Sequence, residues 1–222
     1  MELKYYYIDK AENISPKIYE QTGITDEYIF VNKGDNWGLF SEEELDVIVH
    51  KLKFNGKAKI TEAIYADYRI YVNERIRNIL EEYNIVMHQY VKATFKTMTS
   101  ELLPYYYMHI PLPGVTDYVD YKNSTFNGVT LFKTLEDIKV NSKKEFEIAE
   151  KEGRKKDILY LIQIRDIAFT KEFNPETDIL TLLYLPSKYQ YLVSERLKNR
   201  LEEENITGII FKEYPYKISI SE

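Results

Sequence analysis

Hydrophobic and polar positions follow the same order in two stretches of the chain, residues 71–85 and 192–206. The two stretches share Val, Glu, Arg, Asn, Leu, Glu, Glu, Asn and Ile in register. Apolar side chains four residues apart, such as Ile76 and Leu80 in the first stretch, form one narrow stripe of a helix. A strand-length apolar segment follows each stretch. The pattern therefore predicts a unit of a strand, a helix and a second strand that occurs two times in the chain.

Both predicted helices have similar boundaries. Asn73 and Ser194 stand at the N-cap, where a side-chain oxygen accepts a hydrogen bond from a backbone N–H of the first turn. A glutamate follows each cap, at the positive end of the helix dipole. Asn84 and Asn205 stand where a residue in the left-handed conformation can end a helix. These features specify folding, and we expect most of them to be scaffold.

Other elements follow from shorter patterns. Ser41 and Glu44 form a capping box, which predicts a helix with Leu45, Ile48 and Leu52 along one side. Gly153 and its basic neighbours predict an exposed turn, and residues 116–130 are rich in turn formers. Further strands are predicted at residues 5–8, 27–31, 104–110 and 158–164, and residues 178–185 fit either a strand or a helix.

These elements predict an α/β or α+β fold, with a mixed sheet, helices and two pseudo-repeated strand-helix-strand units. We expect an N-terminal half at residues 1–100 and a C-terminal half at residues 101–222, together forming one compact domain. Whether the two units join one sheet or lie in separate lobes is open at this stage.

Composition narrows the possible functions. The chain has 222 residues, 44% of them hydrophobic and 30% charged, which is typical of a soluble globular protein. It has 21 Tyr and no Cys, so disulfides, thiolate metal sites and cysteine nucleophiles are excluded. A net charge of -6 argues against general binding of nucleic acids. With no signal-peptide pattern and no membrane-length apolar run, we expect a cytoplasmic protein without membrane contacts.

Few residues are candidates for chemistry. Asp117 and Asp120, with Ser124 four residues further on, form a turn that can bring two carboxylates and a hydroxyl together for acid–base work or for binding a hard cation. The alternative is that they make turns and caps. Trp37, in a loop of Gly, Asp and Asn, is either an exposed anchor for a partner or partly buried packing.

No metal or cofactor is expected. The three histidines, His50, His88 and His109, do not stand at metal-ligand spacing and fit hydrogen-bonded structural roles. The chain also has no phosphate-binding glycine loop, nucleophile elbow or zinc-protease signature. This absence lowers the expectation of an enzyme.

The second stretch resembles a known family. Its Ser194-Glu-Arg196 start, its acidic helix end and Gly208 shortly before Phe211 are similar to the C-terminal signature of the immunity-eleven-type proteins, which bacteria encode beside polymorphic toxins. The resemblance covers mainly residues 158–211. The first stretch departs from it, with Asn73 in place of the serine and Met87 in place of the glycine.

The resemblance implies a non-enzymatic protein that binds and neutralises a cognate toxin, without catalytic residues. An acidic surface would suit a basic toxin. The candidate partner-binding residues are Trp37, Asp117, Asp120 and Ser124. Two other hypotheses are a small hydrolase that uses Asp117 and Asp120, and a structural protein of a phage or mobile element.

Overall fold

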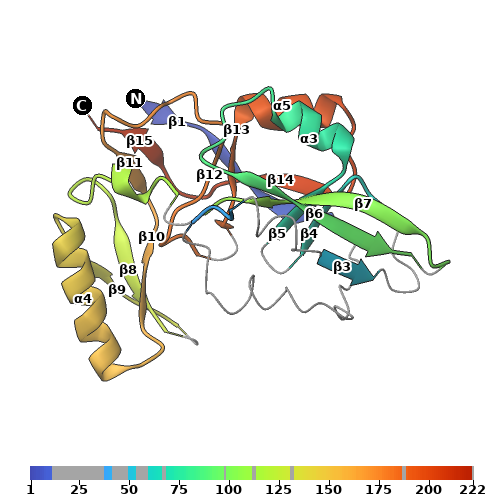
Figure 1. Cartoon of the computed structure of the whole chain (residues 1–222). Helices are drawn as coiled ribbons and strands as arrows, with labels where there is room; N and C mark the ends of the chain where they lie inside the picture. The colour runs from blue at the N-terminus through green and yellow to red at the C-terminus, as the bar shows by residue number, and fades with distance from the viewer. Residues whose placement is uncertain are drawn as a thin grey trace.

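The computed structural model describes residues 1–11, 38–41, 50–53, 60–66, 69–97, 99–111, 114–130, 133–186 and 189–221. In these ranges the chain has an α+β fold, which confirms the predicted fold class: helices α3, α4 and α5 accompany strands arranged in four sheets (Figure 1). The helices are α3 (Glu74–Leu80), α4 (Lys143–Lys156) and α5 (Glu195–Glu203), with a short 3₁₀ helix, η1 (Thr116–Tyr118).

Two larger sheets form the body of the protein. The five-stranded sheet has the order β3-β6-β7-β5-β4, made of His50–Lys53, Gln89–Lys96, Leu102–His109, Arg69–Val72 and Ala63–Ala66. The four-stranded sheet has the order β12-β13-β2-β14, made of Ile179–Leu180, Leu192–Ser194, Tyr5–Lys10 and Ile209–Glu213.

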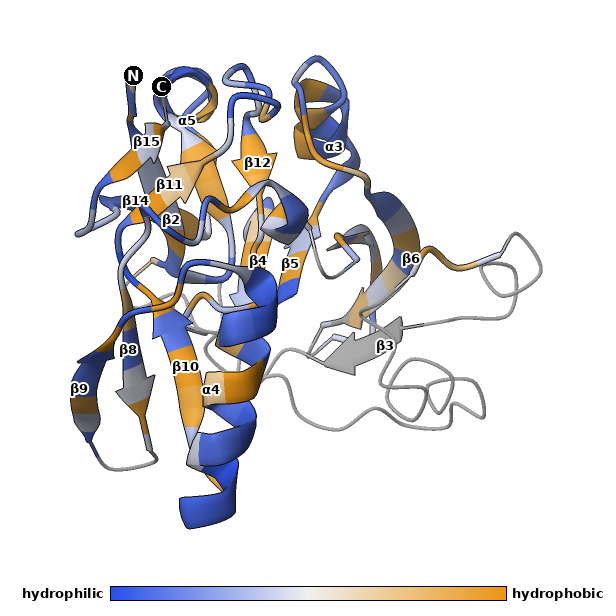
Figure 2. Cartoon of the chain, turned by 90° about the vertical axis from the view of Figure 1, so that its left-hand side faces the viewer, coloured by the Kyte–Doolittle hydropathy of each residue, from blue (hydrophilic) through white to orange (hydrophobic). Residues whose placement is uncertain are grey.

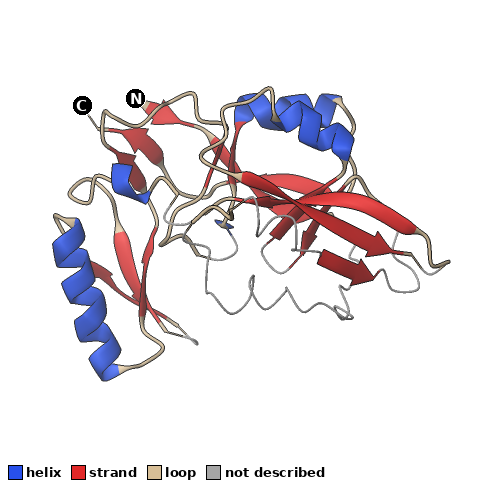
Figure 3. Cartoon of the chain, viewed as in Figure 1, coloured by secondary structure: helices blue, strands red, loops and turns tan. Residues whose placement is uncertain are grey.

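Two three-stranded sheets complete the described fold. One has the order β1-β15-β11, made of Glu2–Leu3, Ile218–Ile220 and Ile167–Phe169. The other has the order β10-β8-β9, made of Leu161–Ile164, Phe126–Val129 and Thr134–Ile138. This last sheet and α4 form a lobe at one end of the molecule (Figure 3).

The two similar stretches adopt the same local topology. In the first unit, defined as β4, β5, α3, β6 and β7, strand β7 lies antiparallel between β5 and β6. In the second unit, defined as β12, β13, α5, β14 and β2, strand β2 lies in the same way between β13 and β14. The two units lie in separate sheets. A common origin of the units stays a prediction.

The strand registers of the two units also correspond. Tyr71 of β5 pairs with Tyr107 of β7, and Leu192, at the matching position of β13, pairs with Tyr7 of β2. The central strands even share a Tyr-Tyr-Tyr sequence, at residues 5–7 and 105–107. Strand β2, from the N-terminal half, pairs with β13 and β14 of the C-terminal half, and β7, from the C-terminal half, pairs with β5 and β6 of the N-terminal half. Strands from both predicted halves therefore share sheets, and the division at residue 100 stays a prediction.

A shared core lies under the two helices. Ile76 and Leu80 of α3 pack in the same buried cluster as Leu197 and Leu201 of α5, all at most 3% exposed. Both helices lie on the same side of the molecule (Figure 1). The apolar stripes predicted from the sequence therefore meet in one cluster, while the charged faces of the helices point to solvent.

Both predicted N-caps are confirmed. The Asn73 side chain accepts from the backbone N–H of Ile76 at 3.0 Å, and Ser194 accepts from Leu197 at 3.2 Å. The predicted left-handed stop is present at Asn205, whose φ is 54°, and absent at Asn84. Helix α3 ends at Leu80, and four residues later the Asn84 backbone N–H donates to the Asp178 carboxylate at 2.9 Å.

Two further sequence predictions are wrong. Leu52, predicted to lie on a helix with Leu45 and Ile48, is in β3, which pairs in parallel with β6. Tertiary pairing overrides the local pattern there, and the rest of the predicted helix lies outside the described residues. The predicted turn at Gly153 is instead part of α4, which Ser142 caps through a hydrogen bond from Glu145 N–H.

The glycine at residue 153 has a packing role. A Cβ atom there would overlap the ring of Tyr160, which lies against the helix just before β10. Phe146, also in α4, is fully buried against Phe126 and Tyr184. Most of α4 is hydrophilic (Figure 2), although Ile148 of this helix is 53% exposed.

Gly208 joins the two units. Its φ is +104°, and a Cβ atom there would overlap the carbonyl oxygen of Ala63, the first residue of β4. Next to it, the Thr207 carbonyl accepts a hydrogen bond from Ala63 N–H at 3.0 Å. The glycine of the second stretch is therefore needed for close contact with the first unit.

We predict that Gly208→Ala lowers the free energy of unfolding by about 2 to 4 kcal/mol, because alanine is strained at this φ and overlaps Ala63. Urea denaturation followed by circular dichroism measures the change. The matched control is Gly38→Ala, since a Cβ atom at Gly38 meets nothing within 4 Å. The control should stay within about 0.5 kcal/mol. Equal stability of the two variants would contradict this account of the joint.

Candidate functional site

A buried carboxylate connects the two units. Asp178, just before β12, has a side chain that is 1% exposed. It accepts hydrogen bonds from the Ser194 hydroxyl at 2.5 Å and from the Asn84 backbone N–H at 2.9 Å. Asn84 follows α3 of the first unit, and Ser194 caps α5 of the second. One side chain therefore fixes the end of one helix region against the start of the other.

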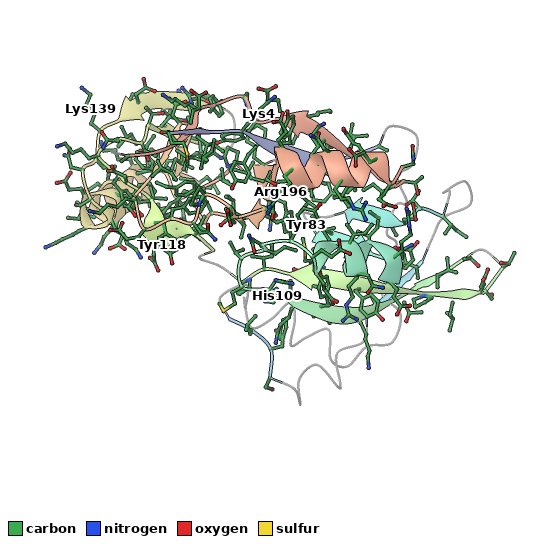
Figure 4. The ribbon with its side chains drawn as sticks, turned by 90° about the horizontal axis from the view of Figure 1, so that it is seen from above. Lys4, Tyr83, His109, Tyr118, Lys139 and Arg196 are labelled. Carbon is green, nitrogen blue, oxygen red and sulfur yellow. The ribbon has the colours of Figure 1, made fainter. Side chains whose placement is uncertain are left out.

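Arg196 balances this buried charge. Its guanidinium donates to both Asp178 oxygens, at 3.2 Å from Nε and 2.5 Å from Nη2, while its own side chain is 58% exposed. Its guanidinium carbon lies 5.4 Å from the ring centroid of Tyr83, which follows α3 (Figure 4). A planar guanidinium suits this two-point contact and ring stacking.

The first unit has a corresponding arginine. Arg75 pairs with Glu62, just before β4, at 2.7 Å, and with Glu204, just after α5, at 2.5 Å. Arg75 and Arg196 occupy matching positions of the two similar stretches. Each arginine thus binds an acidic residue of its own unit and reaches the helix end of the other. Ser194 and Arg196, which carry the family resemblance, have structural contacts in this network.

A groove lies beside this network, at the junction of three segments. We call it the central groove. It has a volume of about 430 Å³ and is open to solvent. Its lining residues are Asn84, Ile85, Val86, Met87, Gly114, Val115, Tyr118, Glu172, Phe173, Asn174 and Thr177.

Large apolar side chains are exposed at the central groove. Met87 is 63% exposed and Tyr118 is 41% exposed. Tyr118 comes from η1, and its ring centroid lies 6.2 Å from that of Phe173, which is buried. Tyrosine and methionine are both enriched where proteins bind one another. The groove therefore offers apolar anchor points next to a rigid floor.

The lining of the central groove has one charged residue, Glu172. A hydrogen bond from the Thr170 side chain is the main reason that the pKa of Glu172 lies below its usual value. The carboxylate is therefore ionised at neutral pH. No Lys or Arg belongs to the described lining, although Lys171, the neighbour of Glu172 in the chain, also lowers the pKa of Glu172.

The predicted residues Asp117, Asp120 and Ser124 are on one connected segment but contact different groups. Asp117, in η1 beside Tyr118, pairs with Lys143 at 3.0 Å, and both side chains are at least half exposed. Asp120 accepts from Ser221 at 2.6 Å and from the Asn123 amide at 2.7 Å.

These contacts define what each residue does locally. Partial burial raises the pKa of Asp120, but the hydrogen bonds from Ser221 and Asn123 outweigh it and hold that pKa below its usual value. The Ser124 hydroxyl accepts from Ala168 N–H at 3.0 Å and donates to the Ala168 carbonyl. Asp120 and Ser124 therefore stabilise the loop against neighbouring strands, and Asp117 is the chain neighbour of Tyr118, which lines the central groove.

Two predicted histidines have structural contacts. Nε2 of His109, which is 1% exposed, lies 2.8 Å from the Gly38 carbonyl, and Nδ1 of His88 lies 3.0 Å from the Val86 carbonyl. Burial lowers the pKa of His109. The hydrogen-bonded role predicted for these two is confirmed. Trp37 lies outside the described residues, and so does the side chain of His50.

Within the described ranges, no group of three or more His, Cys, Asp or Glu side chains is placed to hold a metal ion. Among the helices that the structure describes, none combines the length and apolar character needed to span a membrane.

Sequence reasoning missed the residues that matter most here. The sequence pattern places Asp178 only at the start of an apolar segment, although an acidic residue before a buried strand is itself a signal of a paired charge. Tyr118 and Glu172 carried no motif. Met87 stood out in the sequence because it replaces the glycine of the second stretch.

Comparison with known proteins gives one family. Residues 49–215 match the model of the immunity protein family Imm11. The matched range includes both similar stretches, the Asp178 network and the whole lining of the central groove. No curated protein matches the chain significantly.

We predict that Asp178→Ala lowers the free energy of unfolding by about 3 kcal/mol, because it leaves the Asn84 N–H and the Ser194 hydroxyl without their acceptor. Urea denaturation measures the loss. Asp117→Ala is the control, since its ion pair with Lys143 is exposed, and it should change stability by less than about 0.5 kcal/mol. A small effect of both substitutions would show that the buried carboxylate is not a main connection.

Proposed function

Because the chain belongs to the Imm11 family of immunity proteins, we propose that it protects its own cell by binding and neutralising a cognate bacterial toxin. The single observation that carries this proposal is the family match over residues 49–215. Binding alone is sufficient for the function, since an immunity protein can cover the active surface of its toxin or keep it inactive. The proposal therefore needs an exposed docking surface and no catalytic group.

We further propose a basic toxin, met in the cytoplasm. The net charge of the chain is -6, and opposite charges on two partners speed association and favour correct pairs. Asp117 is the predicted partner-binding residue that fits best, because its side chain is 67% exposed and its chain neighbour Tyr118 lines the central groove. Binding roles for Trp37, Asp120 and Ser124 stay predictions.

The hydrolase hypothesis has less support. A general acid and base pair needs two carboxylates that converge on one substrate. Asp117 is engaged by Lys143, whereas Asp120 is engaged by Ser221 and Asn123. Nothing in this geometry favours catalysis over binding, and nothing in it favours a structural protein of a phage.

The proposal predicts that the tagged chain captures one protein in stoichiometric amount from its native host, and that this protein stops growth when expressed alone. Co-expression of the chain should restore growth. The bound protein is identified by mass spectrometry after capture at about 50 mM and about 500 mM salt, where a complex between opposite charges is weaker at the higher concentration.

The possible results separate the parts of the proposal. A captured protein whose toxicity the chain does not relieve, or no captured protein at either salt concentration, would contradict the immunity function. A neutralised toxin whose binding does not depend on salt would leave the function in place and contradict the basic toxin.

A further inference from the structure

We propose that the central groove is the surface on which the toxin docks, and that it takes an apolar side chain of the toxin beside a lysine or arginine. This inference rests on the proposed function and adds the location and chemistry of the contact. It starts from the exposed side chains of Met87, Tyr118 and Glu172, which line the groove together.

Size and exposure favour a side chain as the occupant. A volume of about 430 Å³ is enough for one or two large side chains, and the groove is open along one side. Burial of Met87 and Tyr118 by a partner would remove exposed apolar surface from water, which is the main favourable term in protein association. Both residues already lie at the surface, so docking requires no opening of the core.

Charge selects the class of partner. Glu172 is ionised, and Glu176 is exposed two residues after Asn174 of the lining, whereas Lys143 balances the charge of Asp117, which lies next to Tyr118. The described lining has no basic residue, and Lys171, which precedes Glu172 and acts on its carboxylate, lies outside that lining. A lysine or arginine of the toxin can therefore pair with Glu172 while a neighbouring apolar side chain enters the groove.

Comparison of the two units gives an independent argument. Residue 87 of the first unit corresponds to residue 208 of the second. In the second unit this position is a buried glycine in contact with Ala63, and the fold there leaves no room for a side chain. In the first unit this position is Met87. The backbone N–H of the preceding residue, Val86, donates to the Ile179 carbonyl, and the Met87 side chain points to solvent. The fold therefore does not need the Met87 side chain, which leaves it available for a partner.

The floor of the groove is rigid. Asn84 is bound to Asp178, and Gly114, at a φ of +59°, lies so close to Thr181 that a Cβ atom there would overlap its carbonyl. A preformed surface loses little conformational entropy on binding. The groove therefore combines a fixed floor with exposed anchors.

Another exposed apolar surface fits a basic toxin less well. Ile158, Leu159 and Leu161 are 85%, 51% and 45% exposed, around the start of β10. They directly follow the basic end of α4, which carries Arg154, Lys155 and Lys156. Arg154 and Lys155 pair with Glu150 and Glu152 of the same helix, and the remaining positive charge of Lys156 is unfavourable for a basic partner. This surface therefore serves as the comparison in the test.

The test measures the dissociation constant of the purified toxin, identified by the growth assay, for variants of the full chain. Met87→Ala, Tyr118→Ala and Glu172→Lys should each weaken binding at least about tenfold. The matched controls are Leu159→Ala, Tyr216→Ala and Glu136→Lys, which change exposed residues outside the groove lining and should stay within about twofold. Urea midpoints establish that each variant is folded.

Each outcome decides a different point. Toxin that is neutralised and bound equally well by all three groove variants would overturn the groove as the docking surface and leave the proposed function intact. Tighter binding by Glu172→Lys would overturn the basic occupant. If Tyr118→Ala does not fold, Met87→Ala and Glu172→Lys, both at exposed side chains, still decide. If the wild-type chain neutralises no toxin, the proposed function and this inference both fail.

Discussion

The buried carboxylate of Asp178 is the interaction on which the arrangement of the two units depends. Removal of a carboxylate from water is costly unless it is paired and hydrogen-bonded, and four donor groups from both units meet that need. The arrangement has a counterpart in Arg75, which joins Glu62 to Glu204. The units are therefore connected by polar contacts at their helix ends and by the apolar cluster under both helices.

The proposed docking surface lies where the two units differ. They share strand order and register, but the position after the helix is a buried glycine in one and an exposed methionine in the other. Gly208 closes its side of the joint by contact with Ala63. Met87 leaves the corresponding side open, where η1 and residues 172–177 complete the central groove. The contact at Gly208 thus stabilises the fold, and the open side at Met87 offers a surface that a partner can cover.

The sequence predicted the features that depend on interactions between residues close together in the chain. The caps at Asn73 and Ser194 and the apolar stripes of both helices were predictable, because spacing and side-chain chemistry specify them. The pattern around Leu52 predicts a helix, because no local feature of the sequence indicates that this segment pairs with β6. The central groove was not predictable, because Met87, Tyr118 and Glu172 are far apart in sequence and only the joint of the units brings them together. The role of Gly208 likewise appears only when Ala63 is beside it.

Hydrogen exchange of the chain, measured by mass spectrometry with and without the toxin that it neutralises, tests the central claim most directly. Our account predicts that bound toxin slows exchange in residues 84–88, 114–118 and 172–177, the three segments of the central groove. Residues 143–164, in α4 and β10, should be unchanged. Protection confined to α4 and β10, with no change in the groove segments, would contradict it.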